Sequence, residues 1–157
     1  MRHPIIIAGS GRSGTTWILD VLAEANGLRT VFEPLHPQAV PGARYYADRF
    51  IGRDAEDEAL RQFMDKVFAG KLNNWWTNYR VRQDLLVPLY DDLSSLNKAK
   101  IFLDRYRQAY INYNRYRHNN SGQIIVKFIR ANLMMGWLEK NYGYRSALVV
   151  RHPGAVV

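Results

Sequence analysis

The residues best suited to chemistry lie in one short segment, residues 9–17, which reads GSGRSGTTW. An apolar run at residues 5–8 precedes this segment, and a helical pattern follows it. A glycine-rich turn between a strand and a helix leaves backbone N–H groups free, and the positive end of the helix dipole points at the same place. Hydroxyl side chains and the guanidinium of Arg12 add further donors. The segment therefore predicts a binding loop for an anion.

The spacing within this loop nearly fits the Walker A pattern of nucleotide-binding loops, G-x-x-x-x-G-K-[ST]. Gly9, Gly14 and Thr16 match the pattern, but Thr15 stands where the pattern has lysine. The loop carries its cation three positions earlier, at Arg12. This difference indicates a transfer chemistry unlike that of an ordinary nucleotide loop. The alternative, a tight turn that binds nothing, does not explain why glycines, hydroxyl residues and an arginine gather at one strand-to-helix junction.

The composition fits one ordered domain that binds anionic partners. The chain has 157 residues, 47% of them hydrophobic, and a formal net charge of +8. This length is enough for one domain with a real core. The positive charge favours anionic partners without choosing among nucleic acid, phospholipid and small phosphorylated ligands. The basic residues are scattered along the chain, which disfavours a nucleic-acid-binding tail.

The residue types also exclude several kinds of site. The sequence has no cysteine, so disulfides, zinc–thiolate sites and thiol catalysis are excluded. Its four histidines show no metal-ligand spacing, and we expect no metal site. No signal peptide or membrane-spanning segment is visible, which predicts a cytoplasmic protein. The chain stops at residues 151–157, just where a helix should begin, and we therefore expect a fragment of a longer protein.

Strands and helices alternate along the sequence. We expect strands at residues 4–8, 28–32, 124–128 and 146–150, and helices at residues 14–26, 54–69, 94–117 and 132–141. This alternation predicts a single α/β domain over residues 1–157, with a central parallel sheet flanked by helices. Within it, residues 40–120 are expected to form a mostly helical insert that provides the acceptor region.

The carboxyl ends of parallel strands form the edge where ligands bind. The first expected strand ends at the glycine loop, the second ends at Glu33 and the last ends at Arg151. The strand at 124–128 contains Lys127 and is followed by Arg130. Magnesium-dependent phosphoryl transfer needs a carboxylate at a neighbouring strand end, where this sequence has cations instead. Sulfuryl transfer fits better, because a sulfuryl group carries less negative charge and needs no metal ion for its stabilisation.

Two motifs together resemble the sulfotransferases that use 3′-phosphoadenosine 5′-phosphosulfate (PAPS) as donor. RSGTTW at residues 12–17 resembles their 5′-phosphosulfate loop, and VVRHPGAVV at residues 149–157 resembles the start of their 3′-phosphate motif. The resemblance covers both ends of the chain but not residues 40–120. It implies a sulfotransferase with a three-layer P-loop-like fold, truncated at the C-terminus. PAPS would be the co-substrate, no metal would be needed, and a small-molecule or carbohydrate acceptor would offer a hydroxyl or an amine.

The resemblance also implies roles for the matching residues. Arg12 would hold the bridging oxygen and the transferring sulfuryl group. Trp17 would stack on the adenine, and Arg151 would bind the 3′-phosphate. The remaining loop residues would bind the 5′-phosphate: Gly11, Ser13, Gly14, Thr15 and Thr16.

An acceptor hydroxyl needs a general base. Glu33, which should end the strand next to the loop, is the first candidate, because several carbohydrate-type members of the family use a glutamate nearby. His36 is the alternative, because cytosolic members use a histidine. An ion pair of Glu33 with Arg12 or Arg29 is an equally supported structural role. Lys127 would reach the sulfuryl group or, equally well, extend from the strand end into solvent.

Two rival functions stay open. A magnesium-dependent P-loop kinase or nucleoside triphosphatase would share the strand–loop–helix unit, but the loop lysine and the strand-end aspartate are missing. A non-catalytic, basic nucleic-acid-binding module would suit the net charge but not its scattered distribution. The expected helix at 94–117 interleaves tyrosines with arginines, and it would serve either as a core-facing helix or as a wall for the acceptor or a nucleic acid.

Overall fold

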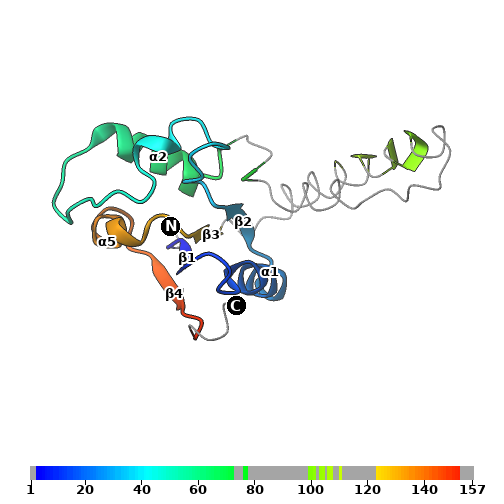
Figure 1. Ribbon diagram of the computed structural model, residues 1–157, viewed down its shortest axis with the longest axis horizontal. Helices are drawn as coiled ribbons and strands as arrows, with labels where there is room; N and C mark the ends of the chain where they lie inside the picture. The colour runs from blue at the N-terminus through cyan, green and yellow to red at the C-terminus, as the bar shows by residue number, and fades with distance from the viewer. Residues whose placement is uncertain are drawn as a thin grey trace.

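In the computed structural model, the residues described are 3–72, 76–77, 99–101, 103–104, 106–107, 110 and 123–152. These residues form one sheet of four strands: β1 (Ile5–Gly9), β2 (Arg29–Phe32), β3 (Ile124–Phe128) and β4 (Arg145–Val149). Every pairing among them is parallel, and the strand order is β2-β3-β1-β4 (Figure 1). The expectation of an α/β fold with a parallel sheet is confirmed.

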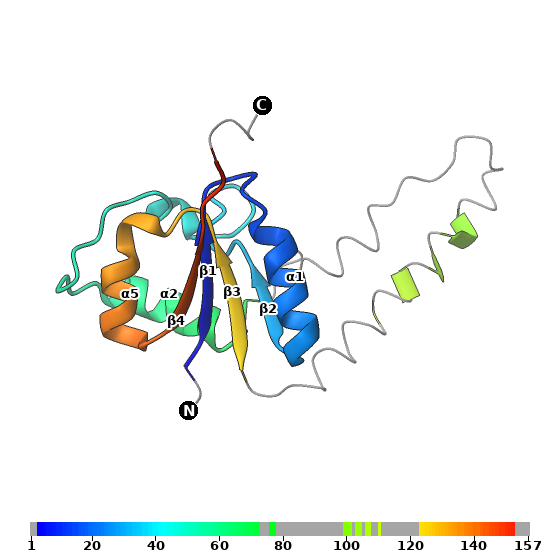
Figure 2. The same cartoon turned by 90° about the horizontal axis from the view of Figure 1, so that it is seen from below.

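Helices cover both faces of this sheet (Figure 2). On one face, α1 (Thr15–Asn26) packs Leu19 against Ile7 and Ile125 of the central strands. On the other face, α2 (Glu58–Phe68) and α5 (Met135–Tyr142) bury a larger apolar cluster that includes Val126 and Trp137. Because β1 and β3 are covered on both sides, their residues are nearly all apolar, as is usual for a buried parallel sheet.

The helix ends follow from local sequence. Gly14 and Gly27 flank α1, and both have positive φ, 90° and 59°, which glycine adopts without a steric penalty. The predicted helix at 54–69 begins later than expected, at Glu58, because the Asp57 side chain accepts a hydrogen bond from the Leu60 N–H at 2.8 Å and caps the helix there. The predicted helix at 132–141 is a 3₁₀ turn, Asn132–Met134, that continues into α5.

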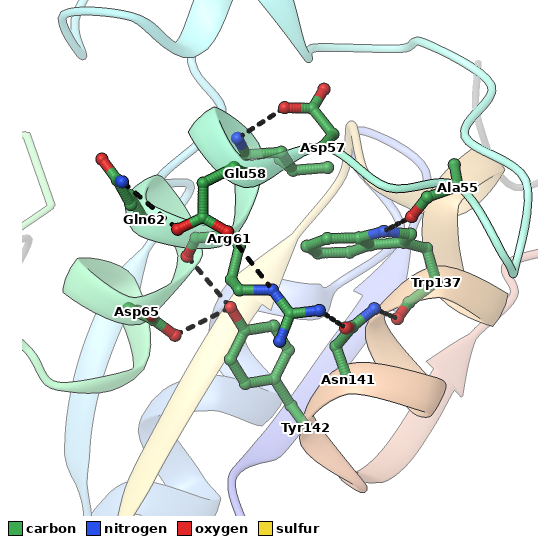
Figure 3. A network of polar contacts seen from close by, with 10 residues as sticks. Ala55, Asp57, Glu58, Arg61, Gln62, Asp65, Trp137, Asn141 and Tyr142 are labelled. Carbon is green, nitrogen blue, oxygen red and sulfur yellow. Dashed lines mark hydrogen bonds and ion pairs between the residues drawn. The ribbon is translucent and has the colours of Figure 1, made fainter.

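Polar contacts join α2 to α5 on the face opposite α1 (Figure 3). The Tyr142 hydroxyl donates to the Asp65 carboxylate at 2.9 Å, and the Arg61 guanidinium donates to Asn141 at 2.7 Å. Burial of the ring, with the hydrogen bond to Asp65, raises the pKa of the Tyr142 hydroxyl. These contacts stabilise the helical layer that covers β1, β2 and β3 on this face of the sheet.

The predicted helix at 94–117 and much of the predicted insert at 40–120 lie outside the described residues, so these two predictions are largely untested. The described part of that insert contains the 3₁₀ turn Ala43–Tyr45, helix α2 and the loops around them. No helix within the described residues has the length and apolarity needed to cross a membrane.

Candidate functional site

The glycine loop follows β1 directly and leads into the first turn of α1 (Figure 2). Two of its residues, Arg12 and Gly14, have positive φ, 60° and 90°. Gly9 lies so close to β4 that a Cβ placed on it would be 2.6 Å from the carbonyl oxygen of Val149. A Cβ at Gly11, in contrast, would meet nothing within 4 Å. The loop is therefore packed tightly at its base and open in its middle.

Several backbone N–H groups of this loop find no acceptor among the described residues. Those of Gly11 to Gly14 donate no hydrogen bond within the described part of the chain. Helix α1 also has no side-chain N-cap and no acidic residue in its first turn. Free amides and the positive end of the dipole make this turn suitable for an anion.

The hydroxyl residues of the loop differ in what they can offer a ligand. The Ser13 hydroxyl donates to the Ser10 carbonyl at 2.7 Å and so shapes the loop itself. Thr15 is 2% exposed, so its side chain is buried and offers little to a ligand. Thr16 is different, because its Oγ1 accepts a hydrogen bond from the Lys127 ammonium at 2.8 Å. A hydroxyl that already accepts has its hydrogen available for another group, such as an anion.

Lys127 connects this loop to Glu33. Its Nζ lies 2.7 Å from Glu33 Oε1 as well as 2.8 Å from Thr16 Oγ1, and the residue is 5% exposed. The ammonium also lies 4.3 Å from the centroid of the Phe32 ring. The alternative expectation, that Lys127 extends into solvent, is therefore wrong. Its position on β3, the strand between β1 and β2, lets one side chain reach both neighbours.

Glu33 lies directly after β2, is 8% exposed and has a positive φ of 38°. We expected the strand that ends at Glu33 to lie next to the loop-bearing strand β1. This expectation is wrong, because β3 lies between β2 and β1. The ion-pair partners of Glu33 also differ from Arg12 and Arg29. The carboxylate pairs through Oε1 with Lys127 and through Oε2 with Arg130, whose Nη1 is 3.5 Å away.

Arg130 and Asp48 belong to the same cluster, and sequence reasoning did not place them among the site residues. The Arg130 Nε lies 3.7 Å from Asp48 Oδ2, and the Asp48 N–H donates to the Arg130 carbonyl at 3.0 Å. Arg130 carried a visible signal, because it follows a strand that already holds Lys127. Asp48 carried none, because it lies in an irregular loop far from Arg130 in the sequence, and only the fold brings the two residues together.

Arg151 meets the glycine loop from the other end of the sequence. Its Nη1 donates to the carbonyl oxygen of Arg12 at 3.2 Å, across 139 positions of chain. Strand β4 pairs with β1 in a register that sets Val149 opposite Gly9, which brings the next residues of both strands together. Trp17, in the first turn of α1, is 70% exposed. The structure thus brings Val149 and Arg151, in the described part of the second motif, to the glycine loop.

His36 lies in the turn that follows Glu33. Its Nδ1 accepts a hydrogen bond from the Ala39 N–H at 3.1 Å, and its ring packs against Trp76 with 4.3 Å between the ring centroids. This hydrogen bond uses the lone pair of Nδ1. Within the described part of the chain, His36 contacts this turn and Trp76, and it makes no hydrogen bond or ring contact with the glycine loop or Lys127.

No group of three His, Asp or Glu side chains among the described residues is arranged to hold a metal ion. Comparisons with protein-family models, with curated proteins and with solved structures found no match. The functional assignment therefore depends on the site geometry and the sequence motifs.

Proposed function

We propose that this protein is a sulfotransferase that moves a sulfuryl group from PAPS to the hydroxyl or amine of an acceptor. The observation that carries the proposal is the contact between the two motifs that resemble the family. The Arg151 guanidinium lies 3.2 Å from the backbone of Arg12, inside the glycine loop. A nucleotide with phosphates at its 5′ and 3′ positions would suit this arrangement, because the loop could bind the 5′ group while the neighbouring Arg151 binds the 3′-phosphate.

In this proposal the donor lies along the loop. The 5′-phosphosulfate is bound by the Thr16 hydroxyl and by the N–H groups of Gly11 to Gly14, which have no acceptor among the described residues. The open space at Gly11 lets an anion approach the backbone closely. Trp17, which is exposed, stacks on the adenine, and Arg151 binds the 3′-phosphate.

The transfer itself needs a proton acceptor and a set of cations. The acceptor oxygen or nitrogen attacks the sulfur in line, the bond from sulfur to the 5′-phosphate oxygen breaks, and Glu33 takes the acceptor's proton. Arg12 and the loop amides stabilise the negative charge that develops on the leaving phosphate. Lys127, hydrogen-bonded to both Thr16 and Glu33, is the cation between donor loop and base.

The groups beside Thr16 distinguish this proposal from a magnesium-dependent kinase. In P-loop kinases and nucleoside triphosphatases, a hydroxyl at this loop position and a nearby carboxylate hold magnesium. In this protein the hydroxyl contacts the Lys127 ammonium, and the Glu33 carboxylate contacts the same ammonium. A basic nucleic-acid-binding module would not require the buried pair of Lys127 with Glu33.

A transfer assay tests the proposal. The protein is incubated with PAPS labelled with ³⁵S and with a phenol, a monosaccharide or a primary amine, and the labelled products are separated by chromatography. We expect transfer to at least one acceptor class and its loss in Arg12→Ala. The matched control is Arg145→Ala, since Arg145 is an exposed arginine at the opposite end of β4. Turnover of ATP with magnesium in place of PAPS, or full transfer by Arg12→Ala, would reject the proposal.

A further inference from the structure

Arg151 lies beside the glycine loop and also forms a hydrogen bond with the loop backbone. Its Nη1 donates to the Arg12 carbonyl oxygen at 3.2 Å. Arg12 has a φ of 60°, in the left-handed region that residues other than glycine seldom adopt. The hydrogen bond therefore ends on a residue whose conformation needs support from its surroundings.

The fold fixes where this arginine can act. The base of the loop touches β4 directly, because Gly9 is paired with Val149 and a Cβ on Gly9 would lie 2.6 Å from the Val149 carbonyl oxygen. Residues 150–152, directly after β4, then pass the loop that follows β1 (Figure 2). Arg151, two residues beyond Val149, reaches the Arg12 carbonyl from this side. The loop is thus held at its base by β4 and at its middle by Arg151, which follows β4.

We propose that Arg151 is a positioning residue for the loop, in addition to the role toward a 3′-phosphate that the proposed function gives it. Its hydrogen bond holds the Arg12 carbonyl and keeps the loop in the observed conformation, in which the N–H groups of Gly11 to Gly14 have no acceptor within the described part of the chain. A guanidinium has five N–H donors in a fixed fork, so one can hold the carbonyl while others bind a phosphate. This inference depends on the proposed function and assigns Arg151 a second task within it.

Two nucleotides that differ by one phosphate separate the two tasks. 3′-Phosphoadenosine 5′-phosphate (PAP) carries the 3′-phosphate, and 5′-AMP does not. A residue that only binds the 3′-phosphate affects PAP alone, whereas a residue that also positions the loop affects both. The affinities of both nucleotides are measured by NMR titration for the wild type, Arg151→Ala, Arg151→Lys and the control Arg145→Ala.

We expect Arg151→Ala to weaken 5′-AMP about tenfold, the lower end for one lost hydrogen bond from a charged group, and to weaken PAP about a hundredfold or more. Arg151→Lys keeps a charged donor and should regain most of the affinity for 5′-AMP. Arg145→Ala should bind both nucleotides as the wild type does. Because Arg151 is exposed, the melting temperature of both Arg151 variants should stay near that of the wild type.

Two results would overturn the inference. If Arg151→Ala binds 5′-AMP as the wild type does while losing PAP, Arg151 serves the 3′-phosphate alone. If the wild type binds neither nucleotide, the proposed function fails, and a ligand-free crystal structure of Arg151→Ala decides the positioning role by itself. In that structure Arg12 should leave the positive-φ region, and an unchanged φ at Arg12 would refute the positioning role.

Discussion

Replacing Lys127 by methionine removes the ammonium that joins the glycine loop to Glu33. Methionine is also long and unbranched, so most of the apolar packing along the side chain is kept while both hydrogen bonds are lost. Glu33, which is 8% exposed, then retains the contact with Arg130 at 3.5 Å. The substitution therefore removes the partner of Glu33 at 2.7 Å, Lys127, and leaves the buried carboxylate with Arg130 alone among the ion-pair partners described.

The size of the effect follows from this burial. Removing one partner of a buried ion pair costs about 3–5 kcal/mol, and the remaining contact with Arg130 places the expected loss at about 3 kcal/mol. For a chain of this length, that loss lowers the melting temperature by about 6–12 °C. Adding Glu33→Gln to Lys127→Met removes the unpaired charge and should return about 1–2 kcal/mol. The double variant should thus be more stable than Lys127→Met.

Urea unfolding followed by circular dichroism measures these free energies for the wild type, both single variants and the double variant. The four values form a double-mutant cycle that isolates the coupling between Lys127 and Glu33. The reasoning is refuted if Lys127→Met loses less than about 1 kcal/mol, or if Glu33→Gln has the same effect with and without Lys127.

Three further predictions concern the loop and the base. Glu33→Gln should bind PAP as the wild type does and transfer the sulfuryl group at least about 100-fold more slowly. Unchanged turnover would mean that Glu33 is not the base. Trp17→Ala should unfold at the wild-type temperature, because the side chain is 70% exposed, and should bind PAP about tenfold more weakly in calorimetry; equal affinity would mean that Trp17 does not stack on adenine. Gly9→Ala should lower the midpoint of urea unfolding, because its Cβ would lie 2.6 Å from the Val149 carbonyl oxygen, whereas Gly11→Ala should leave the midpoint unchanged. Equal midpoints for the two variants would contradict the packing described for the loop.

The strands were predictable because their signals are local. Strand β3 occupies residues 124–128 as expected, since a short run of apolar residues stands between polar segments. Helix α1 also matches its expected range closely, because Gly14 and Gly27 mark its ends. The start of α2 was less predictable, because the segment before Asp57 is rich in polar residues that can either begin a helix or precede one.

The sequence was enough to predict several residues of the site, but it did not predict which of them contact one another. The rule that ligands bind at the carboxyl ends of parallel strands selected Glu33, Lys127 and Arg151 from the sequence. Strand order cannot be derived from the same pattern, so the position of Lys127 between the loop and Glu33 was not foreseen. Asp48 was also missed, because its contact with Arg130 depends on how a long irregular loop folds over the sheet.

The central claim is that main-chain amides and arginines bind both phosphates of an adenosine nucleotide without a metal ion. Titration calorimetry with PAP, first with magnesium and then with excess EDTA, tests it most directly. We predict one site per chain, the same affinity under both conditions, and much weaker binding of ATP. PAP binding that disappears in EDTA, or a preference for ATP with magnesium, would contradict the claim.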